Sequence, residues 1–139
     1  MSGPISRRED PERPPRAART PLDDHFGSPR NAGMLDDADL SVRVENPVCG
    51  DILHLYIRRD AGGRVAASRF QVYGCPAAIA AGSALTQLIE GRTAAELGRI
   101  GRDAIATALG GLAADRLHAA VLARDAIEAA LARWKRGEP

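Results

Sequence analysis

The sequence predicts a single α+β domain in which a three-stranded antiparallel sheet packs against helices from the C-terminal half. Segments with alternating apolar residues lie before residue 74, and Ala-rich segments with helical spacing lie after it. A length of 139 residues leaves room for one such domain. Hydrophobic residues make up 45% of the chain and aromatic residues only 4%, so the core should consist mainly of Ala, Leu, Ile and Val.

The N-terminal residues 1–21 are expected to form a disordered tail, because five prolines lie among mixed charges with few apolar side chains. The folded domain is therefore assigned to residues 22–139. Residues 22–39 form a transitional stretch in which Leu22 and Phe26 are spaced to dock one short helical turn. His25 lies in this irregular segment and is expected to be solvated.

Three strands are predicted after this stretch. Residues 40–45 alternate and are rich in valine. Residues 51–58 place three apolar side chains on one face, with His54 on the opposite, solvent-facing side. Turn residues at 60–63 lead into a strand over residues 64–73, so the second and third strands are expected to form a hairpin.

The remaining chain is predicted to be helical. A helix over residues 76–90 ends before a glycine, the residue that commonly terminates helices. Thr93 and Glu96 form a capping box that opens a short helix. Asp103 is expected to cap another short helix, and the last helix is expected over about residues 115–136.

Charge and hydropathy argue against several functional classes. A net charge of +1 gives no electrostatic reason to expect nucleic-acid binding. No apolar run approaches the roughly 18 residues of a membrane span, and no secretory signal pattern is present. We therefore expect a cytoplasmic protein, in which two cysteines serve better as ligands or nucleophiles than as a disulfide.

Cys49 and Asp51 form the first candidate site. In an extended backbone, residues two apart point to the same face. A thiolate and a carboxylate side by side repel each other unless a cation lies between them, and this donor pair suits zinc or iron. The alternative is a buried structural cysteine beside a turn-forming aspartate.

Cys75 and His118 are further candidates. Cys75 lies where a strand ends and a helix begins, with Pro76 at the favoured first helical position. A helix N-terminus stabilises negative charge, so a thiolate there suits a ligand or a nucleophile, and the alternative is a small apolar cap. His118 lies in the first turn of the last helix, where a lone histidine is more often a surface or core residue than a ligand.

Four segments resemble the U-type iron–sulfur cluster scaffold family, which includes IscU and the N-terminal domain of NifU. They are HFGSPRNAG at 25–33, PVCGD at 47–51, FQVYGCPAAIAAGSALT at 70–86 and LHAAVLARDAIEAAL at 117–131. In that family, three cysteines hold a [2Fe–2S] cluster or zinc, with an aspartate and a histidine nearby. Cys49 and Cys75 resemble the first two cysteines, Asp51 the aspartate, and His118 the histidine preceding the third cysteine. Ala119 occupies the place of that third cysteine.

The resemblance implies a non-enzymatic scaffold or carrier that binds iron, a [2Fe–2S] cluster or zinc through Cys49, Asp51, Cys75 and His118. It also implies a cysteine desulfurase and apo iron–sulfur acceptor proteins as partners, and a monomer or weak dimer. Ala119 supports an alternative, a degenerate relative that docks on the desulfurase or another assembly protein without building clusters. In a third interpretation, Cys75 accepts sulfur as the nucleophile of a sulfurtransferase-type relay.

Overall fold

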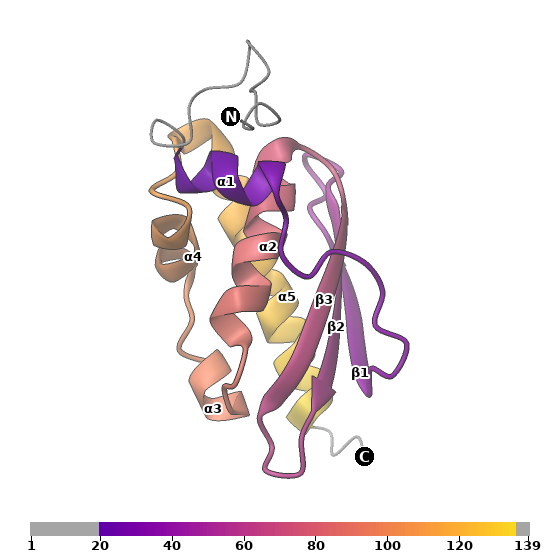
Figure 1. Ribbon diagram of the computed structural model, residues 1–139. Helices are drawn as coiled ribbons and strands as arrows, with labels where there is room; N and C mark the ends of the chain where they lie inside the picture. The colour runs from indigo at the N-terminus through magenta and orange to yellow at the C-terminus, as the bar shows by residue number, and fades with distance from the viewer. Residues whose placement is uncertain (1–19, 136–139) are drawn as a thin grey trace, which may run out of the picture.

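The computed structural model describes residues 20–135 (Figure 1). A three-stranded sheet is followed by helices, which confirms the predicted α+β order. The elements are α1 (Pro21–Gly27), β1 (Leu40–Glu45), β2 (Ile52–Arg59), β3 (Val65–Tyr73), α2 (Pro76–Ile89), α3 (Ala94–Leu97), α4 (Arg102–Ala108), a 3-10 turn (Ala114–Arg116) and α5 (Leu117–Lys135). No helix in this part of the chain combines the length and apolar character needed to cross a bilayer.

The sheet has the order β1-β2-β3 and both strand pairs are antiparallel. Leu53, Leu55 and Ile57 point to the inner face and are buried, as the alternation in β2 predicts. Helices α2 and α5 lie side by side against this inner face (Figure 1). His54 lies on the opposite face, where its ring stacks on Tyr56 and is only half-buried. The sheet therefore has one covered face and one open face.

Helix α2 is the central helix of the domain, since most of its residues are buried. Small side chains allow it to approach the sheet closely. At Gly82, an added Cβ atom would lie 2.4 Å from the ring of Phe70 on β3, a distance that Cβ atoms essentially never adopt. Gly82 therefore provides the space in which the Phe70 ring packs, and this contact fixes the position of α2 along β3.

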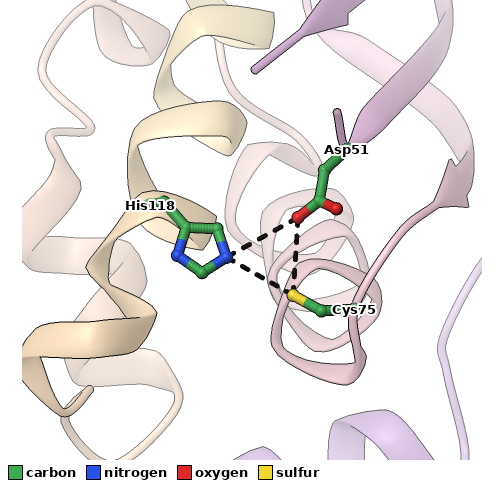
Figure 2. Close-up of side chains that lie close together, drawn as sticks. All are labelled: Asp51, Cys75 and His118. Carbon is green, nitrogen blue, oxygen red and sulfur yellow. Dashed lines mark hydrogen bonds and ion pairs between the residues drawn. The ribbon is translucent and has the colours of Figure 1, made fainter. Parts of the chain in front are cut away.

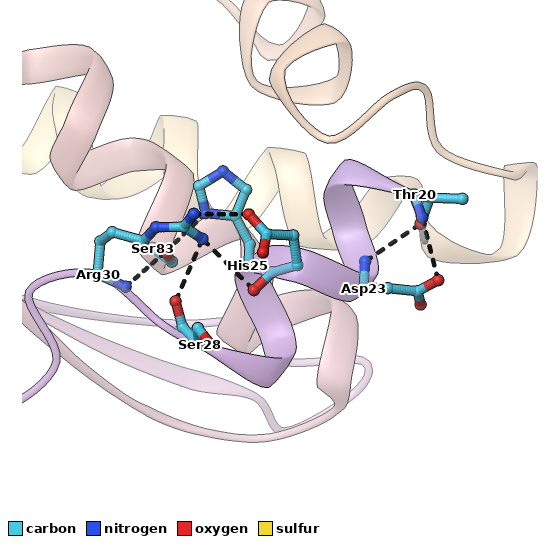
Figure 3. A network of polar contacts seen from close by, with 7 residues as sticks. Thr20, Asp23, His25, Ser28, Arg30 and Ser83 are labelled. Atoms are coloured by element: carbon cyan, nitrogen blue, oxygen red, sulfur yellow. Dashed lines mark hydrogen bonds and ion pairs between the residues drawn. The ribbon is translucent and has the colours of Figure 1, made fainter. Parts of the chain in front are cut away.

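The N-terminal segment is ordered from Thr20 onward. Thr20 and Asp23 form a capping box that begins α1, so Thr20 and Pro21 belong to the folded domain and not to the predicted tail (Figure 3). The rest of that predicted tail, residues 1–19, lies outside the described residues. Leu22 is buried as expected, but Phe26 remains exposed and does not dock.

The expectation that His25 is solvated is wrong, because this side chain packs against α2 and is only 8% exposed. Its Nδ1 atom lies 2.7 Å from the Ser83 hydroxyl, which also accepts a hydrogen bond of 2.8 Å from the Arg30 backbone N–H (Figure 3). Burial and the nearby Arg30 lower the pKa of His25, and Asp24 partly opposes this effect. The contact fastens α1 to the middle of α2.

Residues 31–33 then pair with the edge of β3. Asn31 accepts from the Phe70 N–H at 2.9 Å and Gly33 donates to the Phe70 carbonyl at 2.8 Å. This pairing covers part of a sheet edge that would otherwise expose its hydrogen-bonding groups. At the other end of the chain, α4 begins after Gly101, and Asp103 lies within its first turn. The predicted cap at Asp103 is therefore wrong by two residues.

Candidate metal centre

Three of the predicted donors meet at one end of the sheet, where β2 begins, β3 turns into α2 and α5 begins (Figures 1 and 2). Cys75 Sγ lies 3.4 Å from Asp51 Oδ2 and 3.4 Å from His118 Nε2. The third side of the triangle, from His118 Nε2 to Asp51 Oδ2, measures 3.6 Å. The sulfur, oxygen and nitrogen atoms are thus nearly equidistant.

The size of this triangle suits a shared cation. A tetrahedral zinc ion, with bonds of about 2.0 Å to nitrogen or oxygen and about 2.3 Å to sulfur, separates its ligand atoms by about 3.3–3.6 Å. The separations between the donor atoms of Asp51, Cys75 and His118, 3.4, 3.4 and 3.6 Å, fall in this range. An ion at this position would keep one coordination position free for a further ligand. The donor set therefore fits zinc or a single iron without rearrangement.

Local structure explains the position of Cys75. It is the N-cap of α2, with Pro76 as the first helical residue, as the sequence predicted. Its carbonyl oxygen accepts from the N–H groups of Ala78 and Ile79, while its side chain makes no capping hydrogen bond. The sulfur is therefore directed to Asp51 and His118, at the helix end where negative charge is stabilised.

Asp51 supplies a buried carboxylate, with an exposed fraction of only 6%. It immediately precedes β2, and its backbone carbonyl accepts a 2.8 Å hydrogen bond from Asn46 N–H. Burying an ionised carboxylate costs free energy unless an opposite charge or hydrogen-bond donors surround it. A cation bound at the shared position would offset this cost.

The contacts of His118 distinguish a ligand cluster from a nucleophilic relay. In a cysteine–histidine–acid relay, the base uses one ring nitrogen for the nucleophile and the other for the acid. Here both Cys75 and Asp51 face the same atom, His118 Nε2 (Figure 2). The histidine side chain is 25% exposed, so solvent or a cargo can reach it. This convergence on one nitrogen favours coordination over proton relay.

Cys49 lies outside this cluster. The expectation that Cys49 and Asp51 share a face is wrong, because Gly50 between them has a left-handed backbone with φ of 77°. The turn directs Cys49 to solvent while Asp51 is buried. The side chain of Asn46 holds the turn by accepting from the N–H groups of Val48 and Cys49, at 2.9 and 3.2 Å. The sequence analysis missed this role of Asn46, although its position before a proline is a turn signal.

Ala119 does not line the cluster. Its side chain is 0% exposed and packs in the hydrophobic core. Successive residues of an α-helix point about 100° apart, so His118 and Ala119 leave α5 in different directions. The helix therefore offers one donor to the cluster, and that donor is the histidine.

Comparisons with known proteins agree with this geometry. A family model for the NifU-like N-terminal domain matches residues 19–138. The iron–sulfur cluster assembly scaffold protein IscU 1 of Archaeoglobus fulgidus is 45% identical over 114 residues, covering 81% of this chain and 73% of that protein. The scaffold protein IscU of Escherichia coli is 38% identical over 115 residues, covering 81% and 89%.

The fold is also found among solved structures. A crystal structure of the N-terminal part of a nitrogen-fixing NifU-like protein from Brucella abortus has a TM-score of 0.67 and 21% sequence identity. The match covers 86% of this chain and 94% of that one. At this identity, the likeness concerns the fold. Together with the sequence relatives and the family model, it shows that the chain belongs to the U-type, NifU-like iron–sulfur cluster assembly scaffold family.

Proposed function

We propose that this protein binds an iron–sulfur cluster, or the iron from which one is built, as a scaffold or carrier. The observation that supports the proposal best is the convergence of Asp51, Cys75 and His118 on one position at separations of 3.4–3.6 Å. The names of the relatives, which are cluster assembly scaffold proteins, point to the same cargo. The role is coordination and transfer of cargo, without a catalytic cycle.

Each donor contributes different chemistry. Cys75 supplies a soft thiolate, Asp51 a hard and exchangeable oxygen, and His118 a neutral imidazole nitrogen. The proposed fourth donor is Cys49, which reaches the cargo when the turn around Gly50 shifts. A [2Fe–2S] cluster with histidine among its ligands has precedent in Rieske centres, and a mixed donor set suits cargo that is handed on. Zinc is the proposed alternative occupant.

The proposal includes two kinds of partner, a cysteine desulfurase that supplies sulfur and apo proteins that receive the cluster. Both are expected from the family. The proposed location is the cytoplasm, where a reducing environment keeps Cys49 and Cys75 available as thiols. Both cysteines are free in the structure.

Metal and sulfide analysis of protein purified without oxygen tests the proposal. We expect near-stoichiometric metal, or a visible charge-transfer spectrum after reconstitution with iron and sulfide. Cys75→Ala and His118→Ala should each lose this binding. His54→Ala is a matched control, since His54 lies on the open face of the sheet and outside the cluster. A wild-type protein that stays metal-free after anaerobic reconstitution would refute the proposal.

A second candidate function is a binding module that docks on the desulfurase or another assembly protein without building clusters. Ala119 favours it, because this residue is buried and α5 provides no thiolate at that position. Val48 and Tyr73 also favour it, since both are exposed apolar side chains close in sequence to Asp51 and Cys75. A pull-down that retains the desulfurase after both cysteines become serine, together with absence of metal from the wild type, would support this function over the first.

A further inference from the structure

Gly74 lies directly against the carboxylate of Asp51. A Cβ atom added at residue 74 would lie 2.5 Å from Asp51 Oδ1, 2.6 Å from Asp51 Cγ and 2.9 Å from Asp51 Cβ. Real Cβ atoms essentially never approach other heavy atoms closer than 3.0 Å. All three of the nearest atoms belong to the one side chain that brings oxygen to the candidate metal centre. Any other residue at 74 would therefore have to displace Asp51.

Backbone conformation does not explain this glycine. Within residues 20–135, the glycines with positive φ are Gly33, Gly50, Gly63, Gly91, Gly110 and Gly111, and Gly74 is not among them. An L-residue can adopt the backbone of Gly74 without the strain of the left-handed region. The feature that a side chain at 74 would violate is the space occupied by Asp51.

We propose that Gly74 is a positioning residue for the metal or cluster cargo, because it leaves the space in which the Asp51 carboxylate faces Cys75 and His118. This inference rests on the proposed function. An alanine at 74 would have to move the carboxylate by about half an ångström, because the closest contact of 2.5 Å must open to at least 3.0 Å. Metal–ligand bonds tolerate about ±0.2 Å, so this displacement takes the oxygen out of bonding geometry.

The inference can be tested by a double-mutant cycle with Gly74→Ala, Asp51→Gly and the two combined. Asp51→Gly removes every atom that the new Cβ would meet in that side chain. Gly62→Ala is the matched control, because Gly62 lies in the β2–β3 turn and an added Cβ would only touch a flexible side-chain oxygen at 3.4 Å. Zinc affinity is measured by chelator competition, and the cobalt(II) form by its visible spectrum.

We expect Gly74→Ala to weaken zinc binding by about 10–100-fold, as for other residues that orient a metal ligand. The cobalt(II) d–d bands should shift because one oxygen ligand is lost, whereas the thiolate charge-transfer band from Cys75 should remain. In the Asp51→Gly background, Gly74→Ala should leave zinc affinity unchanged. Gly62→Ala should behave like the wild type in both measurements.

Several outcomes would overturn the inference. One is a Gly74→Ala protein that binds zinc as tightly as the wild type with the same cobalt spectrum. Another is an equal loss of affinity with and without the Asp51 side chain, because the effect would then not pass through this contact. If Gly74→Ala alone fails to fold, the combined variant should fold, and failure of both would contradict the proposed contact.

The cycle separates this inference from the proposed function. If the wild type binds neither zinc, cobalt nor iron, the proposed function fails and the positioning role fails with it. If the wild type binds metal and Gly74→Ala binds it equally well, only the positioning role fails. Melting temperatures of the metal-free variants report on the Gly74–Asp51 contact independently, since only the background with Asp51 should lose stability on Gly74→Ala.

Discussion

Helix α2 carries two clusters of polar side chains, one around Ser83 in its middle and one around Cys75 at its start. Around Ser83, polar atoms are satisfied within the protein (Figure 3). The hydroxyl accepts from the Arg30 backbone N–H at 2.8 Å and lies 2.7 Å from Nδ1 of His25. Because the cluster is closed and Ser83 is fully buried, no external ligand is needed to complete it.

Around Cys75, by contrast, the sulfur, a carboxylate oxygen of Asp51 and Nε2 of His118 face one another across a common position (Figure 2). Each of these atoms can donate a lone pair to a cation. A closed network stabilises the packing of α1 on α2, whereas a convergent set of lone-pair donors has binding capacity that the protein itself does not use. The comparison predicts that the two clusters can be disabled separately.

The largest expected effect is on metal binding by Cys75→Ala. Loss of the sulfur removes a donor present in the convergent set, so zinc affinity should fall by at least about 100-fold, more than the 10–100-fold typical of outer-shell changes. The metal-free protein should keep its melting temperature to within a few degrees, because the Cys75 side chain makes no capping hydrogen bond. Chelator competition and thermal unfolding measure the two effects. Unchanged zinc affinity would show that Cys75 is not a ligand.

Ser83→Ala should show the opposite pattern. It leaves the His25 ring nitrogen and the Arg30 N–H without their shared partner, and each buried polar group left unpaired costs about 1–3 kcal/mol. We expect the free energy of unfolding to fall by about 2–4 kcal/mol in urea denaturation, with zinc affinity unchanged. A large loss of zinc affinity at temperatures where the variant is folded would mean that the two clusters are coupled.

The pH dependence of stability should reveal the Ser83 cluster through His25. The pKa of His25 is lowered in the folded state by burial and by Arg30, whereas in the unfolded chain it is about 6.5. The unfolded state therefore binds more protons as pH falls below about 6.5, so this stability is fully present above that value and is lost towards the lower folded pKa. Urea unfolding of metal-free protein between about pH 8 and pH 5 measures the decline.

His25→Asn is the matched control for this pH dependence, because an amide can occupy the place of Nδ1 beside Ser83 without taking up a proton. The difference in slope between the two proteins isolates His25 from other titrating groups such as His118. Equal slopes for the wild type and His25→Asn would show that His25 does not make stability pH-dependent.

The smallest expected effect is that of Cys49→Ala on metal affinity. Cys49 is exposed and lies outside the convergent set, and water can occupy a fourth zinc position. We expect zinc affinity to fall by about tenfold, which corresponds to about 1.4 kcal/mol. A loss as large as that of Cys75→Ala would mean that the turn around Gly50 closes fully on the metal and that Cys49 is an equal ligand.

Local patterns in the sequence predicted much of the fold. The strand over residues 40–45 agrees in both boundaries with β1, and those over 51–58 and 64–73 differ from β2 and β3 by no more than one residue at each end. The capping box at Thr93 and the helix start at Cys75 are also confirmed. These features depend on alternation and on hydrogen bonds between residues close in sequence, which a single sequence displays directly.

Long-range contacts caused most of the errors. His25 seemed solvated because its neighbours in sequence are irregular, whereas its partner Ser83 lies 58 residues away. Cys49 and Asp51 seemed to share a face because alternation assumes an extended backbone, and the left-handed Gly50 breaks that assumption. The cap at Asp103 was misplaced because Gly101 takes that position without a side chain to signal it.

By itself, the sequence determined the order of the elements, the location of Cys75 at a helix start and the family to which its motifs belong. Only the tertiary structure decided which donors meet. Cys75 lies 24 residues from Asp51 and 43 from His118, and no local rule specifies an approach of 3.4 Å over such separations. That approach follows from packing α2 and α5 against the same face of the sheet, which brings the start of each helix to the beginning of β2.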